Sequence, residues 1–494
     1  MKLIKIYIVI FILMIFNACD EDLLELYPIT SKTEGNFYQN ITEINQAVND
    51  VYRLLGNHYN ITGSGGWDYP GLPDLYGELY SDNTCIILTS GLAGELQDIT
   101  DFRIRSSNNY ISFAWDQCYN AIFILNNILY RLEQTTLVID EPTLNAMKGQ
   151  AILVRSLIYF NMVRAFGAIP YIDKKITTLE SYDYLRVDPS IIYDNLITDL
   201  TYAKQVLPDS WTGNDIGRVT KYGSSAILAK VYLTLGDNNK AKSELEFIMN
   251  SNRFSLDANN DGTIDVNDYF HIFHWDTKNC KSSVLEVQYK SGDNAFNSRH
   301  ANMYAPFNIA FQPPLPWIGK MERGYGFNTP TDELAEEFEQ NDPRQETSVY
   351  PGFYHSVTGE FIKYPFTMKF FDPNWSNKGH NICVIRYADI LLMYAEVTND
   401  PQYLNQVRSR ADMPAYGTEG YPSDKYPTLA LAIEHERRVE LCFEFHRFFD
   451  LVRTGRALEV IQSKGYEINE NKLLFPIPLE AIDVHKKLTQ NPGY

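Results

Sequence analysis

Residues 257–268 form an acidic twelve-residue segment whose residue types and spacing are those of a calcium-binding loop. Oxygen-bearing side chains fall at the first, third, fifth and ninth positions, and Gly262 stands at the sixth, where such loops turn sharply. The twelfth position holds an Asp instead of the Glu that gives bidentate ligation, and an Asx-rich turn without metal remains the alternative. We predict a structural calcium site with these ligands: Asp257, Asn259, Asp261, Thr263 (through its backbone carbonyl), Asp265 and Asp268.

Catalytic patterns that need a fixed spacing do not occur in the sequence. His435 and Glu436 begin like a zinc-protease motif, but Val439 stands where the second His should be. There is no nucleophile elbow and no phosphate-binding GK[ST] loop. The five cysteines beyond residue 19 are odd in number and lack a CxxC pair, which argues against a disulfide framework or a zinc site. Carboxylate pairs are too common in this acidic chain to exclude a glycosidase by counting, but we predict that the protein is not an enzyme.

Charged side chains at helical spacing run through residues 434–453, interleaved with bulky aromatic ones. Such a pattern could be a catalytic acid–base cluster or a set of ion pairs at a junction between helices. We favour the structural role, because each carboxylate has an arginine within helical reach. The predicted pairs are Glu434 with Arg437 and Arg438, Glu444 with Arg447, and Asp450 with Arg453.

The N-terminal residues predict export and lipid anchoring. A short basic start precedes the apolar run 6–16, which is too short for a stable membrane span but fits the core of a signal peptide. Ala18 and Cys19 then resemble a lipoprotein cleavage box, although Phe16 departs from its usual Leu. We expect residues 1–18 to be removed and Cys19 to be acylated, with an ordinary secretory signal as the alternative. Beyond residue 19 no segment reaches the length of a membrane span.

The composition of the chain limits its partners, and its apolar periodicity predicts helices. The chain has 494 residues, of which 45% are hydrophobic, and a formal net charge of −19. A surface so acidic repels phosphate backbones, so nucleic acid is not an expected partner. Apolar residues recur at helical spacing in several segments, with Gly- and Pro-rich loops between them. The expected helices are 42–55, 113–133, 145–166 and 190–206, and the expected loops are 63–77, 211–217 and 306–330.

One segment has the spacing of a tetratricopeptide repeat, with small residues that let two antiparallel helices approach closely. Ser225 replaces the usual Trp of such a repeat and Arg253 the usual Pro, so a generic helical hairpin fits nearly as well. The residues that carry the spacing are Leu228, Ala229, Tyr232, Ala241 and Leu245.

Several longer stretches together resemble the SusD/RagB family of outer-membrane nutrient-binding lipoproteins, from Cys19 to the C-terminus. They are RSLIYFNMVRAFGAIP (155–170), RYADILLMYAE (386–396), ERRVELCFEFHRFFDLVR (436–453), the Pro-Ile-Pro at 476–478 and the Asn-Pro-Gly-Tyr at 491–494.

The resemblance implies a mainly α fold built on tetratricopeptide-type hairpins with long irregular loops, and a lipid anchor in the outer membrane facing outward. It also implies a TonB-dependent SusC-like transporter as partner and a glycan as ligand. We expect one domain over 19–494, with an N-terminal part to about 220, a C-terminal part from 221, and the calcium loop as an insert. An oligopeptide ligand, as in RagB-like proteins, or a tetratricopeptide scaffold that binds only proteins are the alternatives.

Aromatic residues in loops are the candidate ligand contacts, because sugar rings present apolar C–H faces that stack on exposed aromatic rings. The family draws its ligand site from roughly two regions, near residues 63–70 and 299–317, and only the regions are carried over. Trp115 lies on a helical face instead and is expected in the core. The predicted ligand-binding residues are Trp67, Tyr69, Arg299, Tyr304 and Trp317.

Overall fold

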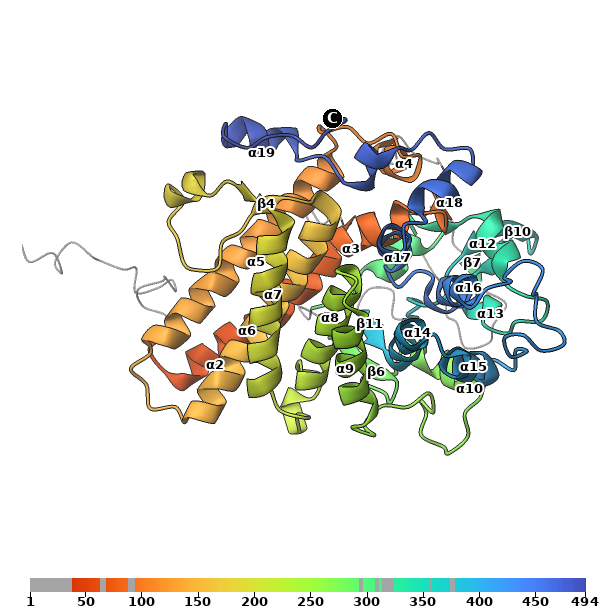
Figure 1. Cartoon of the computed structure of the whole chain (residues 1–494), viewed down its shortest axis with the longest axis horizontal. Helices are drawn as coiled ribbons and strands as arrows, with labels where there is room; N and C mark the ends of the chain where they lie inside the picture. The colour runs from red at the N-terminus through yellow and green to blue at the C-terminus, as the bar shows by residue number, and fades with distance from the viewer. Residues whose placement is uncertain are drawn as a thin grey trace, which may run out of the picture.

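The computed structural model describes residues 38–62, 68–87, 94–292, 296–306, 311–312, 324–355, 357–373 and 378–494. The fold is mainly helical, as predicted. The helices α5, α6 and α7 lie side by side and are followed by α8 and α9, while α14, α15 and α16 lie on the opposite side with β6, β7, β10 and β11 (Figure 1). No helix among the described residues is both long and apolar enough to cross a membrane.

The N-terminal half supplies the long helices. They are α2 (Ile41–Tyr59), α3 (Leu72–Asp74), α4 (Gly94–Thr100), α5 (Asn109–Gln134), α6 (Glu141–Phe166), α7 (Pro189–Val206), α8 (Lys221–Thr234) and α9 (Asn238–Met249), with the π-helix η2 (Leu75–Leu79) and the 3-10 turns η4 (Glu180–Asp183) and η5 (Gly213–Asp215).

The C-terminal half is built from shorter helices. They are α10 (Val266–Ile272), α11 (His300–Tyr304), α12 (Asp332–Glu337), α13 (Gln345–Ser348), α14 (Tyr387–Thr398), α15 (Pro401–Arg410), α16 (Leu429–Leu441), α17 (Arg447–Arg453), α18 (Ala457–Ser463), η6 (Glu470–Leu473) and α19 (Leu479–Val484).

The described strands are short and pair antiparallel. Four pairs join β1 (Asn60–Thr62) to β2 (Asp68–Pro70), β3 (Thr84–Cys85) to β8 (Thr329–Pro330), β4 (Ile169–Pro170) to β5 (Arg186–Val187), and β6 (Ser283–Val287) to β11 (Ile382–Arg386). A three-stranded sheet has the order β10 (Phe361–Phe366), β9 (Tyr350–His355), β7 (Phe311–Gln312).

The helix boundaries follow capping chemistry. The side chain of Asn40 accepts a hydrogen bond from the backbone N–H of Glu43 and so caps α2. Asp140 caps α6 in the same way, and α6 ends at Gly167, whose φ of 70° suits glycine. The four helices predicted from periodicity are confirmed as α2, α5, α6 and α7. Residues 72–77 of the predicted loop 63–77 are helical instead, because they belong to α3 and η2.

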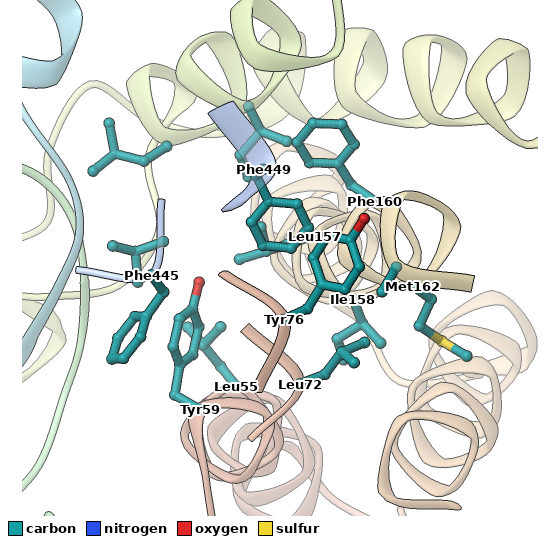
Figure 2. Close-up of a cluster of buried hydrophobic side chains, with 14 of the residues drawn as sticks. Leu55, Tyr59, Leu72, Tyr76, Leu157, Ile158, Phe160, Met162, Phe445 and Phe449 are labelled. Atoms are coloured by element: carbon teal, nitrogen blue, oxygen red, sulfur yellow. The ribbon is translucent and has the colours of Figure 1, made fainter. Parts of the chain in front are cut away.

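α6 runs through the middle of the core and is buried along most of its length. Figure 2 shows its Leu157 and Phe160 facing Tyr76 of η2 and Phe449 of α17, which come from distant parts of the sequence. The rings of Tyr76 and Phe449 lie 4.8 Å apart, centroid to centroid. Trp115 is 4% exposed and packs on Phe166, so its predicted core position is confirmed. The first helices and the C-terminal helices therefore share one hydrophobic core.

α8 and α9 form the helical hairpin that the repeat-like spacing predicts. Leu228, Ala229, Ala241 and Leu245 are buried between the helices or against their neighbours, and Tyr232 is 8% exposed. Ser225, which stands where a repeat would have Trp, donates a hydrogen bond to the backbone carbonyl of Glu244 across the hairpin. The hairpin is confirmed, and its assignment as a tetratricopeptide repeat stays a prediction.

Candidate functional site

The two loops predicted to carry the ligand-stacking tryptophans leave the fold from neighbouring segments. Trp67 and Trp317 themselves lie outside the described residues. The first loop leaves from the β1–β2 pair, and β2 lies against α11, which ends just before the second loop begins. β3 pairs with β8, so the segment after the second loop also returns to this region. The bases of both predicted ligand loops are thus gathered on one part of the molecule.

Tyr69 sits at the base of the first loop. Its ring lies 4.8 Å from that of Phe113 and 5.6 Å from that of Tyr110, both on α5. These contacts hold the ring in place and leave it half-buried. Arg299, at the N-terminus of α11, is likewise half-buried. Both residues therefore keep part of their surface exposed.

Tyr304 corrects the sequence prediction. Its side chain is 1% exposed, its ring is covered by His300 and Phe370, and its hydroxyl donates a hydrogen bond to Asp74. A ring so covered cannot stack on a ligand. The sequence placed Tyr304 just before the expected loop 306–330, but residues 300–304 form α11, and Tyr304 is buried in the core. Because Asp74 follows the first loop and Tyr304 precedes the second, their hydrogen bond joins the bases of the two loops.

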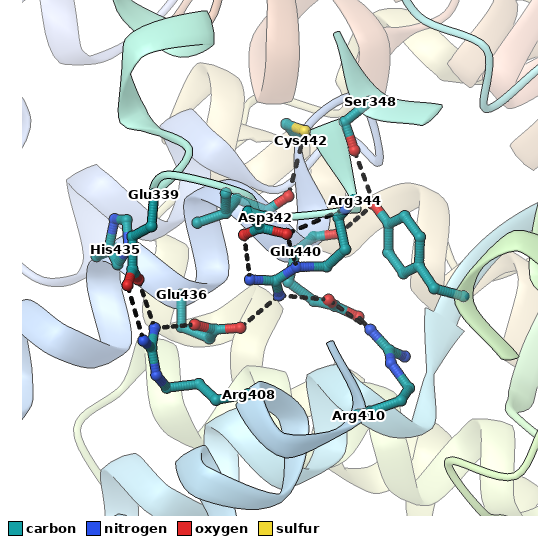
Figure 3. A network of polar contacts seen from close by, with 12 residues as sticks. Glu339, Asp342, Arg344, Ser348, Arg408, Arg410, His435, Glu436, Glu440 and Cys442 are labelled. Carbon is teal, nitrogen blue, oxygen red and sulfur yellow. Dashed lines mark hydrogen bonds and ion pairs between the residues drawn. The ribbon is translucent and has the colours of Figure 1, made fainter. Parts of the chain in front are cut away.

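A buried network of ions occupies the junction of α13, α14, α15 and α16 (Figure 3). The carboxylate of Glu440 is fully buried and accepts hydrogen bonds from Arg344 (2.9 Å), Arg410 (2.6 Å) and Arg386. We call the following ten linked residues the arginine–glutamate network: Arg344, Lys369, Arg386, Arg408 and Arg410 with Glu339, Asp342, Glu436, Glu440 and Glu444.

The predicted structural role of the charged stretch 434–453 agrees with this network, but most of the predicted pairs are wrong. Glu444 contacts Lys369 and Arg386 instead of Arg447, because α16 ends at Leu441 and Glu444 lies in the turn before α17. Phe443 and Phe445 in that turn have φ values of 64° and 67°, which breaks the helical spacing.

Of the other predicted pairs, those of Glu434 do not form and that of Asp450 does. Glu434 bonds Arg456 at 3.0 Å and approaches Arg447 at 3.7 Å, while Arg437 and Arg438 turn to other partners. The pair of Asp450 with Arg453 is confirmed at 3.3 Å. Sequence spacing thus found pairs within one helix and missed those between segments, which include Asp82 with Arg438 and Arg447.

His435 is held by two carboxylates and not by metal-binding geometry. Its Nδ1 lies 2.8 Å from Glu337 and its Nε2 lies 3.0 Å from Glu339. Burial opposes protonation, but the hydrogen bonds with both carboxylates outweigh it and raise the pKa of His435. Burial raises the pKa of the Glu339 carboxyl, but the hydrogen bonds from His435 and Arg408 outweigh it and lower this pKa to about 2.

One carboxyl group has a pKa suited to acid–base chemistry but has no access to a substrate. Burial raises the pKa of Glu78 to about 7, although Asn83 and the backbone N–H of Phe445 both donate hydrogen bonds to its carboxylate. Glu78 belongs to η2, and it is 0% exposed. A shifted pKa marks a catalytic candidate only where a substrate can reach it, so Glu78 is a structural acid.

The predicted calcium loop has the expected turn. Gly262 has a φ of 90°, and both carboxylate oxygens of Asp257 accept backbone N–H groups, from Asp261 and Gly262. Asn259 also folds over this turn and donates a hydrogen bond to Asp261 at 3.0 Å. Thr263 is exposed, so its carbonyl lies at the surface of the loop.

Asp268 has a role that the sequence reading missed. Its buried carboxylate accepts hydrogen bonds from the backbone of Ala258, Asn259 and Asp265, and with Asp265 it forms a capping box at the start of α10. The spacing Asp-x-x-Asp before an apolar run was the available signal. No group of three or more His, Cys, Asp or Glu side chains within the described ranges is placed to hold a metal. The calcium site, which would also use Asn259 and a carbonyl, stays a prediction.

Solved structures with this fold define the class of protein. A laminarin-binding SusD-like protein matches with a TM-score of 0.75 at 25% identity, covering 92% of this chain and all of that one. The surface glycan-binding protein A from Bacteroides thetaiotaomicron, in complex with laminarihexaose, shares the fold with a TM-score of 0.75 at 22% identity. The fold is therefore that of the SusD-like proteins.

Family models and curated relatives agree with the fold. One model, described as the SusD family, matches residues 352–494, and another, described as starch-binding and associating with the outer membrane, matches residues 73–233. SusD-like protein P2 from Formosa agariphila is 25% identical over the whole of both chains. A SusD-like protein from Bacteroides ovatus is 22% identical over 92% of this chain and 83% of its own length. The chain belongs to the SusD-like family, whose members are binding proteins and not enzymes.

Proposed function

We propose that this protein binds an oligosaccharide or polysaccharide fragment at the cell surface and passes it to a SusC-like TonB-dependent transporter. It is held to the outer membrane by a lipid on Cys19 and faces outward. The observation that carries the glycan assignment is the match over the full length to SusD-like proteins, including one that binds laminarin. The outer-membrane description of the family model supports the location.

The arrangement around the predicted ligand loops suits a fixed binding surface. The bases of the two loops are joined by β2 against α11 and by the hydrogen bond from Tyr304 to Asp74. Such a fixed base suits two tryptophans that must keep a constant separation to stack on one glycan, because pre-organisation reduces the entropy lost on binding. An oligopeptide ligand is the second candidate, favoured only by the family's RagB branch.

Two loop variants test this proposal. If Trp67 and Trp317 form an aromatic platform, each stacking contact contributes on the order of 1–2 kcal/mol. Trp67→Ala and Trp317→Ala should then each weaken binding about tenfold, as measured by calorimetry with a glycan that the wild type retains in affinity gels. The unfolding free energies of both variants should stay close to that of the wild type. Phe166→Ala is the core control, because it should lower the unfolding free energy without an effect specific to the ligand.

The same samples separate a binder from an enzyme. After long incubation the glycan should be recovered intact. Recovery of shortened oligosaccharides would contradict the binding-only proposal. Unchanged affinity in both tryptophan variants would show that the glycan binds elsewhere on the molecule.

A further inference from the structure

A cleft in the described part of the protein is lined by residues outside the two predicted ligand loops. α5, α19 and the segment 170–184 enclose a cleft of about 420 Å³. Figure 1 shows α19 at the edge of the molecule beside α5, and the two helices are in contact. Trp115, Tyr119 and Ile176 form part of its apolar wall, and Phe123 and Val484 stand at its opening. A cleft of this size and apolar character is typical of a binding site for a small ligand or a short chain segment.

Exposed apolar side chains stand at the opening of the cleft. Phe123 (46% exposed) and Val484 (63%) line it. Four further exposed apolar residues are sequence neighbours of lining residues: Leu179, Tyr182, Leu185 and Leu479. Exposed apolar side chains at a cleft are typical of surfaces that contact another molecule.

Two carboxylates in the cleft lack a basic partner within the described residues. Asp116 forms no ion pair there, and burial together with the charge of Glu480 raises its pKa. Glu480 accepts a hydrogen bond from the Ser112 hydroxyl at 3.1 Å. Lys174 also lines the cleft, so one basic side chain stands against these two carboxylates. The cleft therefore carries a net negative charge beside an apolar wall.

An unpartnered imidazole adds to this picture. Both ring nitrogens of His485 are buried, and neither has a hydrogen-bond partner. Tyr182 covers one side of the ring, with centroids 5.5 Å apart. A buried polar group without a partner costs free energy, which a ligand that bonds to it would recover.

The chemistry of the rim decides between classes of ligand. Sugar rings stack on aromatic faces, and the aliphatic lining residues, among them Ile172, Ile176 and Val484, would add little to that contact. Aliphatic side chains of a peptide pack well against them, and a basic side chain would pair with Asp116 and Glu480. We propose that this cleft is a docking site for an extended peptide segment of a partner protein that carries apolar side chains next to a Lys or Arg.

Three blocked peptides that differ in one charge test the proposal. The probes are Ac-Leu-Lys-Leu-Phe-NH2 and its analogues with Gln or Glu in place of Lys, titrated into the mature protein by calorimetry. The Lys peptide should bind at least threefold more tightly than the Gln peptide, and the Glu peptide should bind more weakly still. The variant Asp116→Asn with Glu480→Gln should abolish this preference, because both side chains keep their shape and lose their charge.

Further variants localise the binding. Phe123→Ser should weaken all three peptides about equally, by roughly fivefold, since it removes apolar contact and no charge. Asp424→Asn, an exposed carboxylate in another loop, should change none of the affinities. Equal affinity for the three peptides, absence of binding at millimolar concentration, or binding indifferent to Phe123→Ser would each overturn the proposal. Binding of laminarihexaose that is lost in Phe123→Ser would overturn it too, by assigning the cleft to glycan. Glycan binding at the loops should persist in every cleft variant, so the two proposals fail separately.

Discussion

Removing one charge from the centre of the arginine–glutamate network should destabilise the protein strongly. The network balances five cationic side chains with five carboxylates, and Glu440 contacts three of the arginines while being fully buried. Glu440→Gln keeps the shape of the side chain but leaves one positive charge uncompensated. Breaking a buried pair in this way costs about 3–5 kcal/mol. An exposed pair is the matched control: Asp50→Asn, whose partner Arg53 is largely in solvent, should cost less than about 1 kcal/mol.

A second substitution separates charge from shape. Adding Arg410→Met to Glu440→Gln removes one cation together with the anion and restores the balance, so part of the lost stability should return. Urea unfolding followed by circular dichroism would give the free energies of unfolding for the single and double variants. If Glu440→Gln lowers the free energy of unfolding by less than about 1 kcal/mol, the electrostatic reasoning is refuted. It is also refuted if the double variant loses more free energy of unfolding than the two single variants lose together.

Three further outcomes follow from the site. A chelator should lower the melting temperature and added calcium should restore it; at a calcium concentration a hundred times Kd, the gain in unfolding free energy is up to about 2.7 kcal/mol. The double variant Asp257→Ala with Asp261→Ala should not respond to calcium. A wild type indifferent to calcium would leave a metal-free turn. Because the pKa of His435 is raised in the folded state, its contribution to stability is complete below pH 6.5 and is lost as the pH rises through the folded-state pKa. The unfolding free energy of His435→Gln, measured against pH, should therefore fall less steeply above pH 6.5 than that of the wild type. Labelled fatty acid should enter the wild type in cells but not Cys19→Ala, and equal labelling would exclude the lipid anchor.

Periodicity was sufficient for the long helices, because each buries one face and its apolar spacing records that face. It failed where tertiary contacts decide the local structure. Gly77 suggested a loop, but it lies in a π-helix where a Cβ atom would approach the carbonyl oxygen of Phe445 to 2.1 Å. The glycine is therefore needed for close packing against a segment more than 360 residues later. No local pattern could have revealed that neighbour.

Most of the ion-pair partners predicted for residues 434–453 were wrong, for a physical reason. Sequence spacing can propose partners only within one helix, and it found the pair of Asp450 with Arg453. Most partners of the buried carboxylates come from other segments, as when Arg344 reaches Glu436 at 2.5 Å. Predicting the structural role succeeded because paired charges interleaved with aromatic residues cannot face a substrate freely. Predicting the partners required the fold.

The correction at Tyr304 bears on how a family of binding proteins can change its ligand. A tyrosine that contacted the glycan directly would have to vary with the glycan. Buried against Phe370 and bonded to Asp74, it instead joins the segments from which both predicted ligand loops leave, whatever those loops carry. Because loops tolerate substitution far better than the packed core from which they extend, ligand contacts can vary while their spacing is held by buried residues. The residues that best preserve a glycan site in such a fold would then be ones that never touch the glycan.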